Sequence, residues 1–306
     1  MTVRVAFLGT PDLAIPALDA LTDVAEVALV VTQPDRPAGR SLTPVPPPVK
    51  QRAVELGIPV AQPDRSVEVA AALSAHGRFD AAVLVAYGML IRPEALAVPA
   101  RGFLNIHFSI LPRWRGAAPV QRALMAGDSR VGVSVMVLDE GLDTGPVIAT
   151  TSTAVGQMET AGSVGWRLAT AGAHLMTSVL EPFLAGRVVA TPQPAGATTA
   201  PKITPGDRPI DWRWPTWRCL AHVRGLAPKP GATAVYSGEP HKILAAVPAG
   251  GTAIAGSIAA DDGVYVGTGD GRIEILRIQP PGRAEMDAAA WYRGLRSAEP
   301  GFETSR

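Results

Sequence analysis

Residues 3–9 read Val-Arg-Val-Ala-Phe-Leu-Gly, an apolar run that ends at a glycine. Such a run is typical of a buried parallel strand followed by a turn. Pro11-Asp12 then opens a predicted helix that extends to about Thr22, and residues 26–31 form a second apolar run. This β-α-β start predicts a doubly wound α/β domain.

Further apolar runs extend this pattern along the chain. Residues 81–86, 104–112 and 131–138 are predicted strands, and residues 67–76, 119–126 and 160–186 are predicted helices. The sheet is therefore expected to be mostly parallel. The glycine-rich dinucleotide fingerprint is absent, since the turn after the first strand reads Gly-Thr-Pro-Asp, so a nicotinamide or flavin cofactor is not expected there.

Composition restricts the class of protein. The chain has 306 residues and a formal net charge of +1, so the whole molecule is not a polybasic nucleic-acid binder. Its single cysteine, Cys219, excludes an internal disulfide framework and a cysteine metal cluster, which suits the cytoplasm. We expect no metal. The N-terminus lacks the pattern of a signal peptide, and no apolar run is long enough for a membrane span, so no membrane association is expected.

The run Leu-Asn-Ile-His-Phe-Ser-Ile-Leu-Pro at residues 104–112 carries the first candidate site. Read with a period of two, it places Asn105, His107 and Ser109 on one face of a strand and apolar side chains on the other. Asn105 is also the only asparagine in the chain. These residues alone leave two interpretations open, a functional cluster or a hydrogen-bonded polar edge of the sheet.

A tight turn supplies a second candidate. The stretch Gly-Leu-Asp-Thr-Gly at residues 141–145 follows a predicted strand, and its two glycines permit a turn that aims Asp143 back over the sheet. An aspartate in such a turn is often only a turn former. Its place in the same sheet as His107 favours a functional role.

Two loops could line a ligand site. Residues 33–50 form a long predicted loop that is rich in proline and carries Arg36, Arg40 and Lys50. Loops of this length are usually functional or disordered, although a solvated surface loop is the simpler interpretation. The turn Met89-Leu90-Ile91 follows a strand at the sheet edge where α/β proteins bind ligands, or it caps the core.

The C-terminal third changes character. Residues 190–208 are rich in proline and glycine and are predicted to be a linker between domains 1–189 and 209–306. A helix is predicted over residues 216–226. Five short strands follow near residues 233–236, 241–247, 254–259, 264–268 and 272–278, with turns at Ser237-Gly238, Asp262-Gly263 and Asp270-Gly271. This predicts a small β-barrel of the oligonucleotide-binding (OB) type.

Charge is uneven in this part of the chain. Residues 191–250 contain seven basic and three acidic side chains. Basic side chains alternating with Trp212, Trp214 and Trp217 suit contact with a nucleic-acid backbone. A solvated face with tryptophans packed inside the protein is the alternative. The basic residues are Lys202, Arg208, Arg213, Arg218, Arg224, Lys229 and Lys242.

Several of these motifs occur together, in one order and spacing, in one family. The chain resembles the methionyl-tRNA formyltransferases over nearly its full length. The motifs that carry the resemblance are Gly-Thr-Pro-Asp at 9–12, Gln-Pro-Asp-Arg-Pro-Ala-Gly-Arg at 33–40, Val-Ala-Tyr-Gly-Met-Leu-Ile at 85–91, Asn-Ile-His-Phe-Ser-Ile-Leu-Pro-Arg-Trp-Arg-Gly-Ala-Ala-Pro at 105–119, Gly-Leu-Asp-Thr-Gly at 141–145 and Ile-Asp-Trp at 210–212.

The resemblance implies a function and a set of site residues. The family transfers a formyl group from 10-formyltetrahydrofolate, its co-substrate, to the α-amine of methionyl-initiator tRNA in translation initiation. By resemblance, Asn105, His107 and Asp143 match the catalytic trio. Matches to the folate-binding segments are Met89, Leu90, Ile91, Ser109, Ile110, Leu111 and Pro112. We expect tRNA contacts from Arg36, Arg40, Lys50, Lys202, Arg208 and Arg213, and a monomeric enzyme in the cytoplasm.

Three other functions compete with this prediction. The first is a folate-dependent formyltransferase that acts on a small amine, either glycinamide ribonucleotide or an amino sugar nucleotide. The second is a formyltetrahydrofolate hydrolase or a folate-binding module, and the third is a non-enzymatic RNA-binding protein. The long basic loop and the barrel favour tRNA over a small amine. One departure from the family is that Ser41-Leu42-Thr43 stand where paired lysines often follow in the loop.

Overall fold

The computed structural model describes residues 3–37, 43–295 and 300–304, which form two compact units. The first unit comprises Met1–Pro119, Gly132–Thr153 and Gly165–Pro201. The second comprises Val120–Val131, Ala154–Val164 and Lys202–Arg306. Each unit is therefore assembled from separate stretches of sequence. The predicted domain boundaries near residues 189 and 209 remain predictions.

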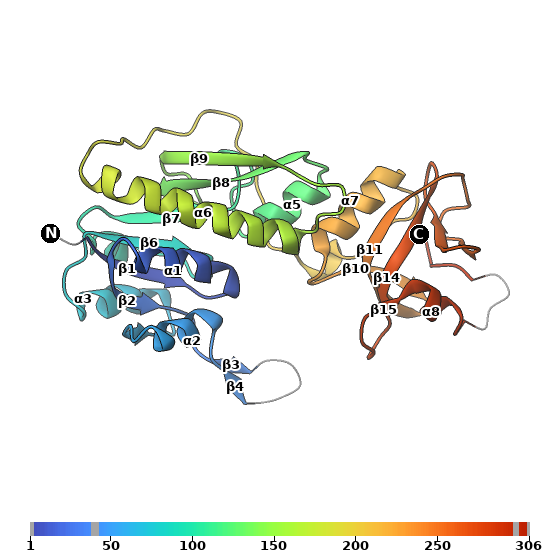
Figure 1. The fold of residues 1–306 in the computed structure, drawn as a ribbon, viewed down its shortest axis with the longest axis horizontal. Coiled ribbons are helices and arrows are strands. Elements are labelled where there is room, and N and C mark those ends of the chain that lie inside the picture. Colours follow the sequence, from blue (N-terminus) through green and yellow to red (C-terminus); the bar gives the residue numbers. More distant parts are fainter. Residues whose placement is uncertain (1–2, 38–42, 296–299, 305–306) are drawn as a thin grey trace. The chain divides into compact units, whose positions relative to one another are not determined.

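The first unit is built on a seven-stranded sheet with the order β5-β2-β1-β6-β7-β8-β9 (Figure 1). Strands β5, β2, β1, β6 and β7 pair in parallel, and β8 pairs antiparallel to β7. The predicted mostly parallel α/β sheet is therefore confirmed. The strands are β1 (Arg4–Gly9), β2 (Glu26–Val31), β5 (Val60–Ala61), β6 (Ala81–Val85), β7 (Phe103–His107), β8 (Arg130–Val137) and β9 (Val147–Ala154).

Helices pack on both faces of this sheet. On one face, alternate residues of β1, β6, β7 and β8 pack against α1 (Ile15–Thr22), α2 (Pro48–Glu55) and α6 (Ala161–Leu184). On the other, the intervening residues of β1, β2 and β6 pack against α3 (Val69–Ser74) and α4 (Pro93–Leu96). Leu104 and Ile106 of β7 belong to the first core and Phe103 to the second. Asn105 and His107 therefore lie on the face opposite α6, as the period of two predicts.

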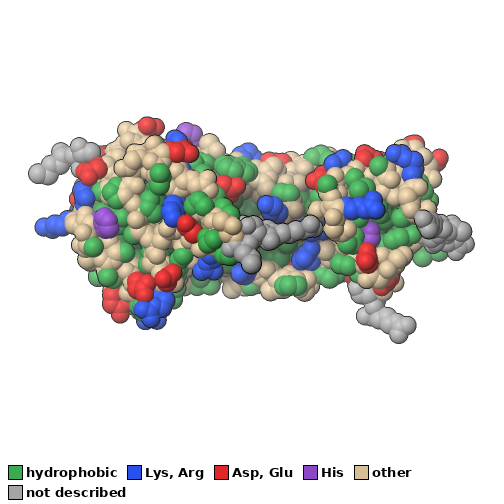
Figure 2. Space-filling model, turned by 90° about the horizontal axis from the view of Figure 1, so that it is seen from below, with side chains coloured by type: hydrophobic (Ala, Val, Ile, Leu, Met, Phe, Trp, Pro, Cys, Tyr) green, Lys and Arg blue, Asp and Glu red, His purple; other side chains and the backbone are tan. Residues whose placement is uncertain are grey.

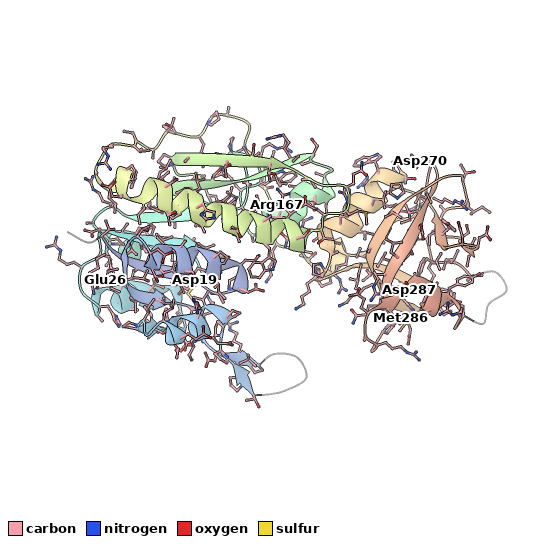
Figure 3. The ribbon with its side chains drawn as sticks, in the orientation of Figure 1. Asp19, Glu26, Arg167, Asp270, Met286 and Asp287 are labelled. Carbon is pink, nitrogen blue, oxygen red and sulfur yellow. The ribbon has the colours of Figure 1, made fainter. Side chains whose placement is uncertain are left out.

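Several expectations about elements need correction. The stretch 33–50 is not one loop, since α2 begins at Pro48 and includes Lys50, and β3 (Arg36–Pro37) pairs with β4 (Pro44–Val45). Proline at the start of α2 costs no helical hydrogen bond, which explains why a proline-rich run ends in a helix. Arg52 of α2 donates to Asp19 of α1 at 2.7 Å, and Asp19 is labelled in Figure 3. Strand β9 and helix α4 were not predicted.

The stretch predicted to be a linker begins as part of the first unit. Thr191 bridges to Val147, and residues 198–200 exchange backbone hydrogen bonds with the loop that follows β7. The amide of Arg115 donates to the carbonyl of Thr198 at 2.8 Å, and the amide of Ala200 donates to the carbonyl of Arg115 at 2.7 Å. This paired backbone restrains both segments, and the linker predicted over residues 190–208 stays a prediction.

The second unit contains a six-stranded antiparallel sheet with the order β10-β11-β14-β13-β12 and with β15 beside β14. Its two-residue turn at Ser237-Gly238 has positive φ at both positions, +51° and +78°, as the predicted tight hairpin requires. The OB-type barrel remains a prediction. The elements are α5 (Pro119–Met125), α7 (Thr216–Leu226), β10 (Ala232–Tyr236), β11 (Glu239–Ala249), β12 (Ile258–Ala260), β13 (Val264–Gly267), β14 (Arg272–Gln279), β15 (Met286–Asp287) and α8 (Ala288–Tyr292).

Three short 3-10 helices, Asp12–Ala14, Ser66–Glu68 and Pro205–Asp207, complete the described elements. Asp287, also labelled in Figure 3, caps α8 by accepting a hydrogen bond from the amide of Ala289 at 2.9 Å. None of the helices in the described ranges has both the length and the apolar character that a membrane span requires.

An ion pair inside the second unit makes its stability depend on pH. Arg122 of α5 donates to Asp207 at 2.7 Å, and the amide and hydroxyl of Thr204 donate to the same carboxylate at 2.8 Å. The Arg122 guanidinium, followed by these two bonds, holds the pKa of Asp207 well below its ordinary value. A depressed pKa stabilises the fold above the pKa of the unfolded chain, about 3.9, and this stabilisation is lost as the pH falls.

We therefore expect Asp207→Asn to destabilise the protein at pH 7 by about 1.5–3 kcal/mol, the range for hydrogen bonds to a charged group. The difference from the wild type should shrink as the pH falls below about 4. Thermal denaturation of both proteins at pH 7 and pH 3 measures this. Asp261→Asn, at an exposed turn position, is the control and should change stability little at either pH. The prediction would be contradicted if Asp207→Asn lowered the stability of the protein by the same amount at both pH values.

Candidate active site

Strand β7 places the first two candidate residues. It pairs in parallel with β6, with Leu84 opposite Asn105, and antiparallel with β8, with Ser134 opposite His107. Asn105 and His107 are each only 5% exposed. Two polar side chains so deeply buried need hydrogen-bond partners, and such partners determine how the side chains are oriented. The strand ends at His107, so the expectation of one strand over residues 104–112 is wrong beyond that residue.

The loop after β8 brings Asp143 to the same place. Because β8 is antiparallel to β7, this loop starts beside the N-terminal end of β7, near Leu104. The loop must therefore fold back to bring Asp143 to His107 at the other end of the strand. Asp139 holds the turn by accepting from the amide of Gly141 at 3.1 Å and from the hydroxyl of Thr144 at 2.7 Å. Asp143 itself has φ of +51°, in the left-handed region that few non-glycine residues adopt. Such backbone strain is typical of a functional position.

The structure brings the predicted trio together. The Asn105 amide nitrogen lies 3.5 Å from one carboxylate oxygen of Asp143, and Nδ1 of His107 lies 3.6 Å from the other. Nε2 of His107 lies 2.9 Å from the carbonyl oxygen of Trp114. A carbonyl only accepts, so Nε2 carries a proton and Nδ1 is the nitrogen that can exchange one. Nδ1 of His107 and the amide of Asn105 therefore both face the carboxylate of Asp143.

Two backbone groups complete the site, and the sequence did not identify either of them. The carbonyl of Trp114 orients His107, and the amide of Gly116 donates to Oδ2 of Asp143 at 2.8 Å. Gly116 has φ of +122°, and a Cβ there would lie 2.8 Å from the carbonyl oxygen of Ala200. Only glycine fits this position without strain. The glycine in the run Trp-Arg-Gly could have indicated an unusual backbone conformation. The sequence gives no indication that a backbone carbonyl or amide contacts a catalytic side chain.

The segment Ser109–Pro112 forms the loop that continues from β7. The Ser109 hydroxyl donates to the carbonyl of Arg113 at 2.6 Å, and the Ser134 hydroxyl donates to the carbonyl of Ser109 at 2.8 Å. The amide of Leu111 donates to Ser134 at 3.2 Å, and the Leu111–Pro112 peptide bond is cis. Ile110 is half-buried and Leu111 is buried. The Ser109 side chain thus shapes this loop from inside.

The turn Met89-Leu90-Ile91 follows β6, the neighbour of β7. Leu90 is 67% exposed, whereas Ile91 packs into the core. Beside this turn, at the carboxyl ends of β1, β2 and β6, lies a pocket of about 400 Å³. Thr10 and Gln33, which line the pocket, both donate to the carbonyl of Tyr87. Ligands of α/β sheets bind at this edge, so the pocket is a second part of the candidate site.

The basic residues predicted to contact tRNA occupy different environments. Arg36 is exposed and lines the pocket described above, whereas Lys50 forms an ion pair with Asp35 at 2.8 Å. Arg40 lies outside the described residues. Lys202 is exposed, Arg213 pairs with Asp211 at 2.8 Å, and Arg208 donates to the carbonyl of Gly231 at 3.2 Å. On the face shown in Figure 2, Lys and Arg side chains are interspersed with acidic and apolar ones.

The three tryptophans do not form one stacking surface. Trp212 is fully buried in the core of the second unit, where it stacks on Phe302 with 5.4 Å between ring centroids. Trp214 is half-buried and packs edge-on against His222. Trp217 is 56% exposed. For Trp212 the alternative interpretation, a tryptophan packed inside the protein, therefore holds, since its indole ring is part of the core.

Comparison with known proteins agrees with this geometry. Residues 3–180 match the family model described as formyl transferase, and residues 202–296 match the model of the formyl transferase C-terminal domain. The methionyl-tRNA formyltransferase of Streptomyces coelicolor is 45% identical over 97% of this chain and 98% of its own length. That of Halorhodospira halophila is 46% identical, with coverage of 97% of each chain. The chain belongs to the methionyl-tRNA formyltransferase family. The predicted family and the formyl-transferring enzyme class are thereby confirmed.

Solved structures share the fold at low sequence identity. WlaRD, a sugar 3N-formyl transferase, superposes with a TM-score of 0.71 over 93% of this chain and all of its own, at 14% identity. HypX from Aquifex aeolicus, in complex with tetrahydrofolic acid, superposes with a TM-score of 0.68 over 99% of this chain and 51% of its own, at 19% identity. The fold of this methionyl-tRNA formyltransferase family member is thus shared with other formyltransferases.

Proposed function

We propose that the protein transfers a formyl group from 10-formyltetrahydrofolate to the α-amine of methionyl-initiator tRNA, which yields N-formylmethionyl-tRNA. The observation that carries this proposal is the convergence of Asn105, His107 and Asp143 in one buried site of a chain from this family. An amide donor, an imidazole and a carboxylate are the groups that transfer of an acyl group between two amines requires.

The amide of Asn105 stabilises the charge that develops on the formyl oxygen. Attack of the amine on the formyl carbon gives a tetrahedral carbon that bears an oxyanion. Asn105 is buried and held between β6 and β8, so its amide is oriented before the substrate arrives. A preorganised donor of this kind typically contributes about 3–4 kcal/mol.

His107 and Asp143 handle the protons. The α-ammonium must lose one proton before its nitrogen can attack the formyl carbon. The same nitrogen loses a second proton after the attack, and N10 of the folate gains one as its bond to the formyl carbon breaks. Nε2 of His107 is committed to the carbonyl of Trp114, so Nδ1 delivers the proton to N10. The Asp143 carboxylate, 3.6 Å from Nδ1, accepts the proton of the amine, directly or through water.

The loops around the trio hold the two substrates. The segments Met89–Ile91 and Ser109–Pro112 extend from neighbouring strands, and we assign the folate to them. Arg36 lines the pocket beside Tyr87. If Arg36 binds the phosphate backbone of the tRNA, the end of the tRNA lies at this pocket. We therefore assign the aminoacyl end of the tRNA to this pocket. Positioning of two substrates in this way can lower the activation free energy by about 7–11 kcal/mol.

Arg36→Ala should weaken use of the tRNA and leave use of the folate unchanged. Arg36 is exposed and contacts phosphate in this proposal, so its loss should raise the KM for methionyl-tRNA about three- to tenfold at low salt. The effect should fade as salt is added, because salt screens exposed charges. Steady-state kinetics at two ionic strengths measure both.

Arg101→Ala is the matched control. Arg101 is exposed and precedes β7, at the end of that strand opposite His107. Its loss should leave both KM values near those of the wild type. An unchanged KM for tRNA in the Arg36 variant would remove this residue from the proposed tRNA contacts.

We place the tRNA backbone also on Arg40, Lys50, Lys202, Arg208 and Arg213.

The competing function is formylation of a small amine. The test is incubation of the protein with 10-formyltetrahydrofolate and one of three acceptors: charged initiator tRNA, glycinamide ribonucleotide or an amino sugar nucleotide. Formylation of the tRNA alone is the expected result. Formylation of a small amine at a higher kcat/KM would overturn the proposal. Release of formate with no acceptor consumed would indicate the hydrolase.

We propose that the active protein is a cytoplasmic monomer.

A further inference from the structure

Gln193 lies in the stretch that composition marks as a linker, 50 residues beyond Asp143 along the chain. Its side-chain nitrogen donates to two backbone carbonyl oxygens of the catalytic turn, that of Asp143 at 2.9 Å and that of Gly145 at 2.8 Å. Its side-chain oxygen accepts from Nε and Nη2 of Arg115, at 3.1 and 2.7 Å. One amide therefore connects the turn that carries Asp143 to the loop that follows β7.

The orientation of this amide is determined by its partners. Two carbonyl oxygens can only accept, so they face the nitrogen, and a guanidinium can only donate, so it faces the oxygen. Both hydrogens and both lone pairs of the amide are thus used. A glutamate has the same shape but would place an oxygen against two carbonyl oxygens. The position is therefore specific for glutamine, although nothing in the surrounding sequence marks it.

The two connected segments carry the groups that orient the catalytic trio. The Asp143 carboxylate accepts from the amide of Gly116, and the carbonyl of Trp114 holds His107. Arg115 stands between these two residues, and its backbone pairs with Thr198 and Ala200. The turn itself is left-handed at Asp143, a conformation that persists only where its surroundings enforce it. Gln193 contacts this strained residue directly.

We propose that Gln193 is a positioning residue for formyl transfer, which holds Asp143 at the distance from Asn105 and His107 that the reaction needs. Gln193 makes its contacts through backbone carbonyls and Arg115, and it acts through Asp143 rather than on the substrates. This inference rests on the proposed function. It assigns a catalytic consequence to the segment 191–200, which pairs with Val147 through Thr191 and with the loop after β7 through residues 198–200.

The test is Gln193→Glu. A displaced Asp143 lowers the rate of the chemical step more than it lowers binding, so kcat should fall about 10- to 100-fold. The KM values for 10-formyltetrahydrofolate and for methionyl-tRNA should stay within about threefold of the wild type, since uniform binding is retained. Titration with 5-formyltetrahydrofolate counts the protein that still binds folate. That fraction should match the wild type, which separates positioning from loss of folded protein.

Gln279→Glu is the matched control. Gln279 of β14 also donates its amide to a backbone carbonyl, that of Arg283 at 2.9 Å, and the same substitution there should leave kcat within about twofold of the wild type. If Gln193→Glu fails to fold, Gln193→Met, which removes the polar group without adding a charge, should give the same kcat loss.

A kcat within about twofold of the wild type for the folded variant would overturn the proposal. The proposal would also be overturned if kcat fell only in proportion to the fraction of protein that still binds 5-formyltetrahydrofolate. Either result leaves the proposed function intact if the wild type and Gln279→Glu formylate methionyl-tRNA. Failure of these two proteins to do so counts against the proposed function itself.

Discussion

Replacing His107 with alanine is expected to lower kcat for formylation by about 10²–10⁴-fold, the contribution typical of a positioned general acid. The imidazole is 5% exposed, and its Nε2 is committed to the carbonyl of Trp114, so Nδ1 is the group that protonates the departing folate nitrogen. Solvent water cannot take over this role at the same rate, because it is not held in place. Binding of tRNA should be nearly unchanged, since the basic residues that we assign to it lie on other segments.

Single-turnover formylation with saturating substrates measures the loss in the chemical step, and filter binding measures the tRNA affinity. His174→Ala is the matched control, since His174 is exposed on α6, on the opposite face of the sheet from His107. This control should react at the rate of the wild type. Near-wild-type turnover by the His107 variant would refute the assignment of His107 as the acid.

Asp143→Asn is the second substitution with a large expected effect. The change removes the negative charge beside Nδ1 of His107, and it replaces one acceptor with a donor. The carboxylate accepts from Gly116 at 2.8 Å and faces the Asn105 amide at 3.5 Å, so either orientation of the new amide sets one donor against another. We expect kcat to fall about 10²–10⁴-fold. The affinity for tRNA should change little.

The matched control for this substitution is Asp64→Asn, the same change at an exposed position of the first unit. Comparing kcat and tRNA affinity for the two variants isolates the effect of position from that of lost charge. Equal and small losses in both variants would show that the Asp143 carboxylate has no part in the reaction. A loss of tRNA binding by Asp143→Asn would instead place the residue in substrate binding.

Most of the fold could be predicted from local patterns. Apolar runs separated by amphipathic stretches indicated β1, β2, β6 and β8 and the helices between them, because a parallel sheet buried on both faces needs such runs. Turn dipeptides located the hairpins of the second unit. Strand β9 was missed because all of its residues are half-buried or exposed, and α2 was missed because it begins in a run of prolines. Strand β9 lacks the alternation of apolar and polar residues on which such predictions depend.

The site was predictable only where side chains and spacing carry the information. Asn105 and His107 share a face because alternation along a strand is a local property. The approach of Asp143 depended on the direction of β8, which the sequence left open. The role of Trp212 also depended on packing, since an indole beside basic residues suits either a core or a stacking surface. The structure places it in the core, against Phe302.

Local sequence patterns were enough to predict a parallel α/β unit, a strand with Asn105 and His107 on one face, and a glycine-bounded turn with Asp143. These follow from the periodicity of side chains and from the freedom of glycine, which act over a few residues. How the three residues meet became visible in the folded chain, where the carbonyl of Trp114, the amide of Gly116 and the side chain of Gln193 contact the trio. Sequence patterns could not show this because backbone groups are the same in every residue. Which of them faces a carboxylate or an imidazole depends on contacts between segments far apart in the chain.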